Sequence, residues 1–388
     1  MKTAIVHAGL HKTGTTSIQG SLANYKDKHT IYADLGRPNH SIVLKTLFHP
    51  PNLFKHWANL GLSPAEHREL VDHYRLKLNE QLQQKHSRIL FSGEEISTLD
   101  PESLDRMKSD FKEQGRDIKI FVFVREPLSM TASIIQEMVK WGDLLHNEST
   151  DNEPVNYLFS ERVGNLLQIF GKEKTHICYY EDALSSKYPR GVIDYFAELL
   201  GIEPEKLPSA RSTNQSISGT SFKLLNQFFQ TDIVHNKGPM LQAARWTFIQ
   251  MLNDAVKTGK DDKVSSTAVR SKVNWDDYRK LNSLLDRPYE IDCHQASTAE
   301  PFSRYCNNID QAEVCKNLMK YFEQHAIPVP ADCNTHELVS LLFYQALREH
   351  AVKQSSTTPI QSHTQSQRNK LRFNIPRKLA QKLNRLKQ

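Results

Sequence analysis

A glycine-containing loop near the start of the chain joins a predicted strand to a predicted helix. Residues 3–7 are expected to form a buried strand, and a helix is expected to begin at Thr15. The loop between them holds Gly9, Lys12 and Gly14 together with several hydroxyl side chains. Backbone N–H groups of such a loop point inward, and the dipole of the following helix favours negative charge there. This stretch therefore predicts an α/β fold with a phosphate-type anion site.

The spacing of the two glycines matches a common phosphate loop, G-x-x-x-x-G-K-[ST], but the lysine is displaced. Thr15 stands where that motif has its lysine, and the lysine lies inside the loop as Lys12. The usual lysine works beside a magnesium ion held by the loop hydroxyl and an acidic residue on a strand. The displaced lysine favours a phosphate chemistry that needs no metal. The alternative is a strand–helix turn in which the glycines and threonines have no ligand.

Three more buried strands are expected, over residues 88–92, 118–124 and 175–180, with helices between them. Strands that alternate with helices indicate a parallel sheet with crossover connections. The predicted fold class is therefore α/β, a three-layer, P-loop-like fold whose central parallel sheet is flanked by helices. After residue 201 the strand signal fades, so a mainly helical C-terminal part is expected.

A second candidate anion site follows the strand at 118–124. Arg125 comes directly after this apolar strand, and ligands of open α/β sheets bind at the carboxyl ends of strands. Ser129 and Ser133 lie four residues apart on the helix expected after Pro127, hence on one face. An arginine and a serine at a helix N-terminus form a phosphate site. The alternative is an arginine paired with a carboxylate and serines on a solvated face.

Two anion sites on separate strands do not fit a nucleoside triphosphate, whose phosphates would all lie in one loop. The two motifs together resemble those of the sulfotransferases that use 3′-phosphoadenosine-5′-phosphosulfate (PAPS). The segment 11–16 is similar to their 5′-phosphosulfate loop, and the segment 122–127 with Ser133 is similar to their 3′-phosphate motif. The segments 91–95 and 214–216 are also similar to parts of these enzymes.

The resemblance implies PAPS as co-substrate and no metal ion. Lys12 would contact the oxygen that bridges phosphate and sulfate, where a fixed cation stabilises the charge developing on the leaving phosphate. Arg125 and Ser133 would hold the 3′-phosphate. The other implied nucleotide ligands are Thr13, Gly14, Thr15, Thr16, Asn214 and Ser216.

The resemblance covers about residues 3–230, and composition divides the rest of the chain. Residues 1–230 are expected to form the PAPS-binding core. Residues 231–350 are expected to form a mainly helical extension that packs on the core and shapes the acceptor site. Residues 351–388 are expected to be a disordered linker and a basic amphipathic tail.

The acceptor group needs a general base that takes its proton. Glu94 is the first candidate, because it ends a predicted strand near the cofactor loops. His40, in the loop after the first crossover, is the second. Glu95 is adjacent to Glu94, and His11 lies in the phosphate loop. His7 alternates inward on its strand and is expected to be packed in the core.

The formal net charge of +6 comes from the C-terminal tail. Residues 368–388 hold eight lysines and arginines and no acid, and without these eight the charge falls from +6 to −2. Leu379, Leu383 and Leu386 recur at helical spacing, which is typical of a basic amphipathic helix on an anionic membrane surface. The alternative is a disordered solubilising tail. Nucleic-acid binding is not expected, because the body of the chain is not basic.

Localisation is expected to be cytoplasmic, with peripheral contact at the inner membrane if the tail binds lipid. No apolar run approaches the 18 residues of a membrane span, and the first strand begins too early for a signal peptide. The five cysteines are odd in number and form no C-x-x-C pair, which favours reduced thiols. Cys293, His294 and Cys306 fit no common zinc spacing.

The predicted function is sulfuryl transfer from PAPS to a hydroxyl or amine of a glycan, glycolipid or small molecule. One alternative is a divergent P-loop kinase that uses ATP and magnesium, with Glu94 or Glu95 as metal ligand. Another is a nucleotide-binding scaffold without activity. The identity of the acceptor and the oligomeric state stay open.

Overall fold

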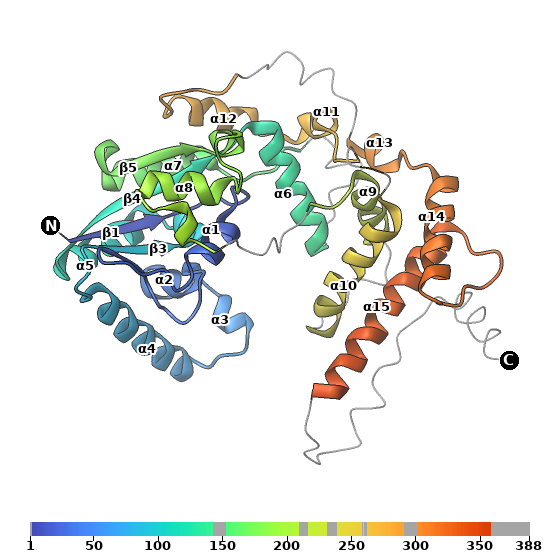
Figure 1. The fold of residues 1–388 in the computed structure, drawn as a ribbon, viewed down its shortest axis with the longest axis horizontal. Coiled ribbons are helices and arrows are strands. Elements are labelled where there is room, and N and C mark those ends of the chain that lie inside the picture. The colour runs from blue at the N-terminus through green and yellow to red at the C-terminus, as the bar shows by residue number, and fades with distance from the viewer. Residues whose placement is uncertain are drawn as a thin grey trace. The chain divides into compact units, whose positions relative to one another are not determined.

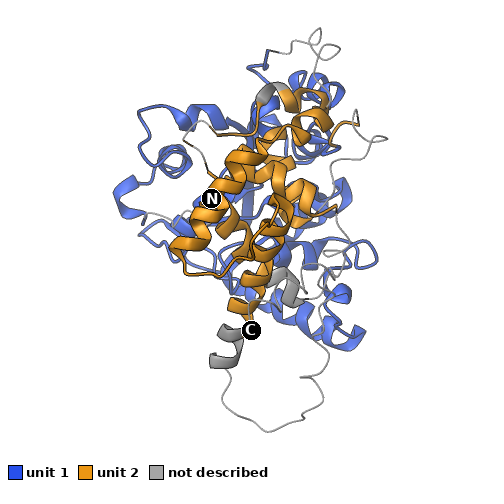
Figure 2. Cartoon of the chain, turned by 90° about the vertical axis from the view of Figure 1, so that its right-hand side faces the viewer, with its two compact units in different colours: residues 1–130, 156–215, 274–293 blue, residues 131–155, 216–273, 294–388 orange. Residues whose placement is uncertain are grey.

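The computed structural model describes residues 2–142, 153–208, 216–230, 239–257, 259, 262–290 and 302–357 (Figure 1). Contacts divide the chain into two compact units that alternate along the sequence (Figure 2). The first unit comprises residues 1–130, 156–215 and 274–293, and the second comprises residues 131–155, 216–273 and 294–388. The predicted domain boundaries at 230 and 350 stay a prediction.

The first unit is built on a parallel sheet of five strands. These are β1 (Lys2–His7), β2 (Thr30–Tyr32), β3 (Arg88–Ser92), β4 (Arg116–Val124) and β5 (Thr175–Tyr179). Their order is β2-β3-β1-β4-β5, and every neighbouring pair is parallel. The predicted α/β class is confirmed. The sequence analysis missed β2, because three residues are too short to display an alternating pattern.

Helices cover both faces of this sheet, which gives the three predicted layers (Figure 1). Two neighbouring residues of β3 pack against helices on opposite faces of the sheet. Leu90 belongs to the apolar cluster that includes Ile18 of α1 and Phe196 of α8, whereas Phe91 packs on Phe111 of α5 with ring centroids 5.3 Å apart. The helices of this unit are α1 (Thr15–Leu22), α2 (Ser41–Phe48), α3 (His56–Asn59), α4 (Pro64–Leu82), α5 (Pro101–Glu113), α7 (Phe159–Phe170), α8 (Val192–Leu200) and α12 (Trp275–Asn282).

The start of α4 is capped by residues close in sequence, whereas the carbonyl groups at its end are bound by a residue from a distant strand. The sequence Ser63-Pro-Ala-Glu66 predicts a capping box, and Ser63 and Glu66 form it at the start of α4. The sequence predicts a helix to about residue 86, but α4 ends at Leu82. Buried Arg116 of β4 donates Nε to the carbonyl of Leu82 at 2.5 Å and its terminal nitrogens to the carbonyls at positions 84 and 86. A distant cation therefore satisfies carbonyl groups at and beyond this helix end.

The second unit is helical in the part that the structure describes, as predicted. Its elements are α9 (Gly219–Phe228), α10 (Pro239–Val256), α11 (Ser266–Val269), α13 (Phe302–Asn307), α14 (Gln311–Gln324) and α15 (Thr335–Thr357). Phe228, Phe248 and Phe343 form its aromatic centre, with ring centroids 5.1–5.3 Å apart. Helix α6 (Pro127–Trp141) begins in the first unit and continues in the second.

Helix α15 extends into the segment predicted to be a linker. It continues past residue 351 to Thr357, and the Ala, Lys and Gln residues found there favour helix. Residues 358–388, including the basic tail, lie outside the described residues. Among the described residues, no helix is long and apolar enough to cross a membrane.

Candidate active site

The loop after β1 is anchored to β4 on its first half. The backbone N–H groups of Ala8 and Leu10 donate to the carbonyls of Phe121 and Phe123, at 2.9 and 3.0 Å, so the strand pairing continues past the end of β1. The hydroxyl of buried Thr13 donates to the carbonyl of Leu10 at 2.6 Å. These bonds hold the beginning of the loop at the carboxyl edge of the sheet.

The second half of the loop turns into α1 through left-handed backbone. Lys12 has a φ of 62° and Gly14 a φ of 82°. A Cβ on Gly14 would lie 2.6 Å from a methyl group of Val192 in α8, so only glycine fits at this position. Gly14 is the N-cap of α1, and it provides no side-chain cap. The N-terminus of α1, with buried Thr15 and exposed Thr16, has the features of an anion site.

Arg125 brings the second predicted anion site to this loop. Its Nη1 donates to the carbonyl of Lys12 at 2.8 Å, and its Nε donates to the hydroxyl of Ser129 at 3.0 Å. Its guanidinium lies over the ring of Tyr180, with 4.5 Å between Cζ and the ring centroid. Two segments that are far apart in the sequence thus meet through one arginine side chain.

The start of α6 differs from the anion site expected there. The carboxylate of Glu126 accepts hydrogen bonds from the N–H groups of Leu128 and Ser129, at 2.9 and 2.8 Å. An acidic side chain thus caps these amides, which the helix would otherwise offer to a ligand. Ser133 lies one turn beyond Ser129, half-buried, on the part of α6 that belongs to the second unit.

Glu94 follows β3 and sits directly against the phosphate loop. A Cβ on Gly9 would lie 3.1 Å from the Cα of Glu94, and a Cβ on Gly93 would lie 2.7 Å from the backbone nitrogen of Ser41. The chain around Glu94 is therefore held by close backbone approach on two sides. Its carboxylate accepts a hydrogen bond from Gln19 Nε2 at 2.9 Å and one from Asn39 Nδ2 at 3.0 Å. Both of these partners are neutral amides.

Glu95, the next residue, is bound by two basic side chains instead. Lys45 Nζ lies 2.9 Å from one of its oxygens, and His11 Nε2 lies 2.8 Å from the other. The hydrogen bond from His11 and the charge of Lys45 hold the pKa of Glu95 well below its ordinary value. Arg162 Nη1 lies 3.3 Å from His11 Nδ1. Since arginine only donates, His11 Nδ1 accepts and its Nε2–H donates to Glu95.

His40, the second candidate base, is completely buried. Its ring stacks on Tyr32 with centroids 4.8 Å apart, and its Nδ1 accepts a hydrogen bond from the Ser92 N–H at 3.1 Å. Burial lowers the pKa of His40 to about 4. His7 is packed in the core as expected, where burial lowers its pKa to about 3. Both rings are therefore neutral at pH 7 and function there as packed core groups.

These two histidines predict an acid-sensitive fold. Between pH 6.5 and about 4 the unfolded chain, with an ordinary histidine pKa of 6.5, binds up to two more protons than the folded chain. The contribution of these histidines to the free energy of unfolding is therefore fully present above about pH 6.5, and it is lost as the pH decreases towards 4. The expected slope is about 1.4 kcal/mol per pH unit for each histidine. Urea unfolding at pH 7.5 and 5.5 measures it, and the double variant His7→Asn/His40→Asn is expected to flatten the dependence. An unchanged slope in that variant would assign the effect to other groups.

The roles predicted for Asn214 and Ser216 as nucleotide ligands stay predictions. Asn214 lies outside the described residues, and Ser216 is exposed in the second unit. Sequence reasoning in turn missed Gln19, Asn39 and Tyr180. The sequence could have indicated Gln19, because it follows Thr15 by four residues and therefore lies on the same face of α1. Asn39 and Tyr180 had none.

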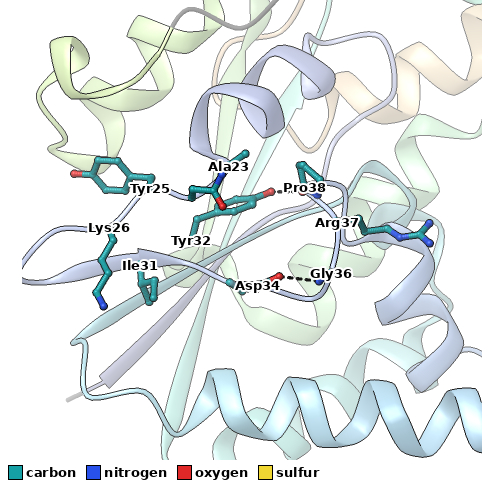
Figure 3. A pocket seen from close by; sticks show the side chains of 11 residues that line it. Ala23, Tyr25, Lys26, Ile31, Tyr32, Asp34, Gly36, Arg37 and Pro38 are labelled. Carbon is teal, nitrogen blue, oxygen red and sulfur yellow. Dashed lines mark hydrogen bonds between the residues drawn. The ribbon is translucent and has the colours of Figure 1, made fainter.

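A separate hollow of about 420 Å³ lies beside β2 (Figure 3). It is lined by Ala23, Asn24, Tyr25, Lys26, Ile31, Tyr32, Ala33, Asp34, Gly36, Arg37 and Pro38, and none of the predicted site residues is among them. Inside it the Tyr32 hydroxyl donates to the carbonyl of Pro38, and Asp34 accepts from the N–H of Gly36 at 2.9 Å. Among the residues that the structure describes, no group of three or more His, Cys, Asp or Glu side chains could hold a metal ion.

Comparison with known proteins shows a structural similarity at low sequence identity. No family model matches the chain, and no curated protein matches it. The chain is similar to a crystal structure of a sulfotransferase from Alicyclobacillus acidocaldarius, with 15% identity and a TM-score of 0.35. The match covers 64% of this chain and 96% of that one.

Proposed function

We propose that this chain transfers a sulfuryl group from PAPS to a hydroxyl or amine of a glycan, glycolipid or small-molecule acceptor. The observation that supports it most directly is the hydrogen bond between Arg125 and the Lys12 carbonyl. Through this bond, a cation from the end of β4 lies beside a loop that leads into a helix without a side-chain cap. A nucleotide with phosphates on both its 5′ and 3′ positions would place the first at the N-terminus of α1 and the second beside the Arg125 guanidinium.

In this proposal the loop holds the 5′ end of PAPS. The N–H groups of Thr13 to Thr16 and the hydroxyls of Thr15 and Thr16 bind the 5′-phosphate, and Lys12 contacts the bridging oxygen. Arg125 and Ser133 bind the 3′-phosphate. No step requires a metal ion, because Lys12 and the helix dipole supply positive charge where the leaving phosphate gains negative charge.

The chemical step is an in-line displacement at sulfur. The acceptor oxygen or nitrogen forms a bond to sulfur while the bond between sulfur and the bridging oxygen breaks. The bridging oxygen keeps the electron pair and leaves as part of adenosine 3′,5′-bisphosphate. The proton of the acceptor goes to a carboxylate of the enzyme.

We infer that Glu94 is this base. Its two partners are neutral amides that orient the carboxylate, and each carboxylate oxygen has a further lone pair for the acceptor proton. Glu95 is paired with Lys45 and His11, which weakens it as a base. His40 is a poorer candidate, because a fully buried ring does not meet an acceptor that arrives from solvent.

Calorimetric binding of adenosine 3′,5′-bisphosphate in the presence of EDTA tests the proposal. We expect binding without metal, and we expect Arg125→Ala to lose most of it. ATP with magnesium is titrated alongside. Binding of ATP that depends on magnesium, without binding of the bisphosphate, would favour the kinase alternative. Bisphosphate binding with no sulfuryl transfer to any acceptor would favour a non-catalytic scaffold.

A further inference from the structure

We propose that Arg125 is a positioning residue for the phosphate loop itself, in addition to its contact with the 3′-phosphate. This inference rests on the proposed function, because it concerns how the loop binds the 5′-phosphate. It predicts that Arg125 controls the affinity for nucleotides that carry no 3′-phosphate at all.

The loop contains one residue whose conformation needs support. Lys12 has a φ of 62°, in the left-handed region, where a residue with a Cβ is disfavoured. Residues in such conformations persist when the surrounding structure fixes them. The orientation of the peptide group after Lys12 decides where the N–H of Thr13 points, and the N–H groups that follow belong to the proposed 5′-phosphate site.

The carbonyl of that same peptide group is the acceptor of Arg125 Nη1, at 2.8 Å. Thr13 is fixed on its other side by the bond from its hydroxyl to the Leu10 carbonyl, at 2.6 Å. The peptide group between Lys12 and Thr13 is thus fixed at its carbonyl by Arg125, and the residue that follows it is fixed through the Thr13 hydroxyl. The bond from Arg125 bridges 113 positions of sequence, so it ties the loop to the end of β4.

Arg125 is itself held in place, so it can act as a rigid support. Its Nε donates to the Ser129 hydroxyl at 3.0 Å, and its Cζ lies over the Tyr180 ring, 4.5 Å from the ring centroid. It follows Val124, which is fully buried at the end of β4. A planar guanidinium can donate in two fixed directions, whereas a lysine ammonium acts as a mobile point charge. The supporting role therefore depends on the shape of the arginine as well as on its charge.

Two ligands and three variants separate this role from 3′-phosphate binding. Adenosine 5′-monophosphate and adenosine 3′,5′-bisphosphate are titrated calorimetrically, in EDTA, into the wild type and into Arg125→Ala, Arg125→Lys and Ser133→Ala. We expect both arginine variants to weaken binding of the monophosphate at least tenfold. Ser133→Ala is the matched control, and we expect it to weaken only binding of the bisphosphate.

Two outcomes would overturn the proposal. If Arg125→Ala binds the monophosphate within twofold of the wild type, Arg125 acts on the 3′-phosphate alone. If Arg125→Lys binds it as the wild type does while Arg125→Ala does not, the effect comes from charge and not from support of the loop.

Amide hydrogen exchange provides a readout that needs no nucleotide. We expect the amides of residues 12–16 to exchange at least tenfold faster in Arg125→Lys than in the wild type, while those of α5 stay unchanged. Equal exchange in the loop would overturn the proposal. If the wild type binds neither nucleotide, the proposed function fails, and the exchange experiment still decides whether Arg125 supports the loop.

Discussion

Replacement of Glu94 by glutamine is expected to lower kcat for sulfuryl transfer by about 10²–10⁴-fold, which is the usual contribution of a general base. Glutamine has nearly the shape of glutamate but cannot take the proton of the acceptor. Its amide NH₂ would also face Gln19 or Asn39, both of which donate to Glu94, so one of these amides has to turn over. Binding of adenosine 3′,5′-bisphosphate should stay within about threefold of the wild type.

Transfer of radiolabelled sulfate from PAPS to a panel of glycan, glycolipid and small alcohol acceptors measures this effect. Glu95→Gln is the matched control, because it makes the same chemical change one residue away. We expect Glu95→Gln to act mainly on stability, since it removes the carboxylate that Lys45 and His11 share. If Glu95→Gln abolished transfer and Glu94→Gln retained it, the base would be Glu95.

The second large effect is expected at Lys12. Lys12→Asn should reduce kcat by about 10²–10³-fold, because it removes the cation that stabilises charge on the leaving phosphate. Asparagine is the informative replacement, since it tolerates the left-handed backbone that this position adopts. The loss should therefore appear in the chemical step, with affinity for the bisphosphate reduced much less.

Single-turnover measurement of the formation of adenosine 3′,5′-bisphosphate from enzyme-bound PAPS follows this chemical step directly. Lys12→Ala serves as the comparison, because it loses the same charge but fits left-handed backbone less well. We expect it to lose more affinity than Lys12→Asn for a similar loss of rate. A Lys12→Asn enzyme with nearly normal kcat would contradict the role of Lys12 in stabilising the leaving group.

Local sequence patterns determined much of the fold. The apolar run at 118–124 and the alternation of strands with helices predicted a parallel sheet with helices on both faces. The capping box at residues 63–66 predicted the start of a helix. The glycines at positions 9 and 14 and the lysine between them predicted the strand–loop–helix site. These features depend on residues that lie a few positions apart, so the chain itself displays them. The strand β2, with only three residues, was too short to do so.

Only the tertiary structure decided how the site is assembled. Glu94 and Glu95 are identical and adjacent, yet Glu94 meets two neutral amides and Glu95 meets two basic side chains. Arg125 reaches the Lys12 carbonyl across 113 positions, and His40, which lies in a polar stretch, becomes fully buried. The reason is physical: an ionisable side chain is tuned by the groups packed around it. In a parallel sheet, chain crossovers bring those groups together from distant parts of the sequence.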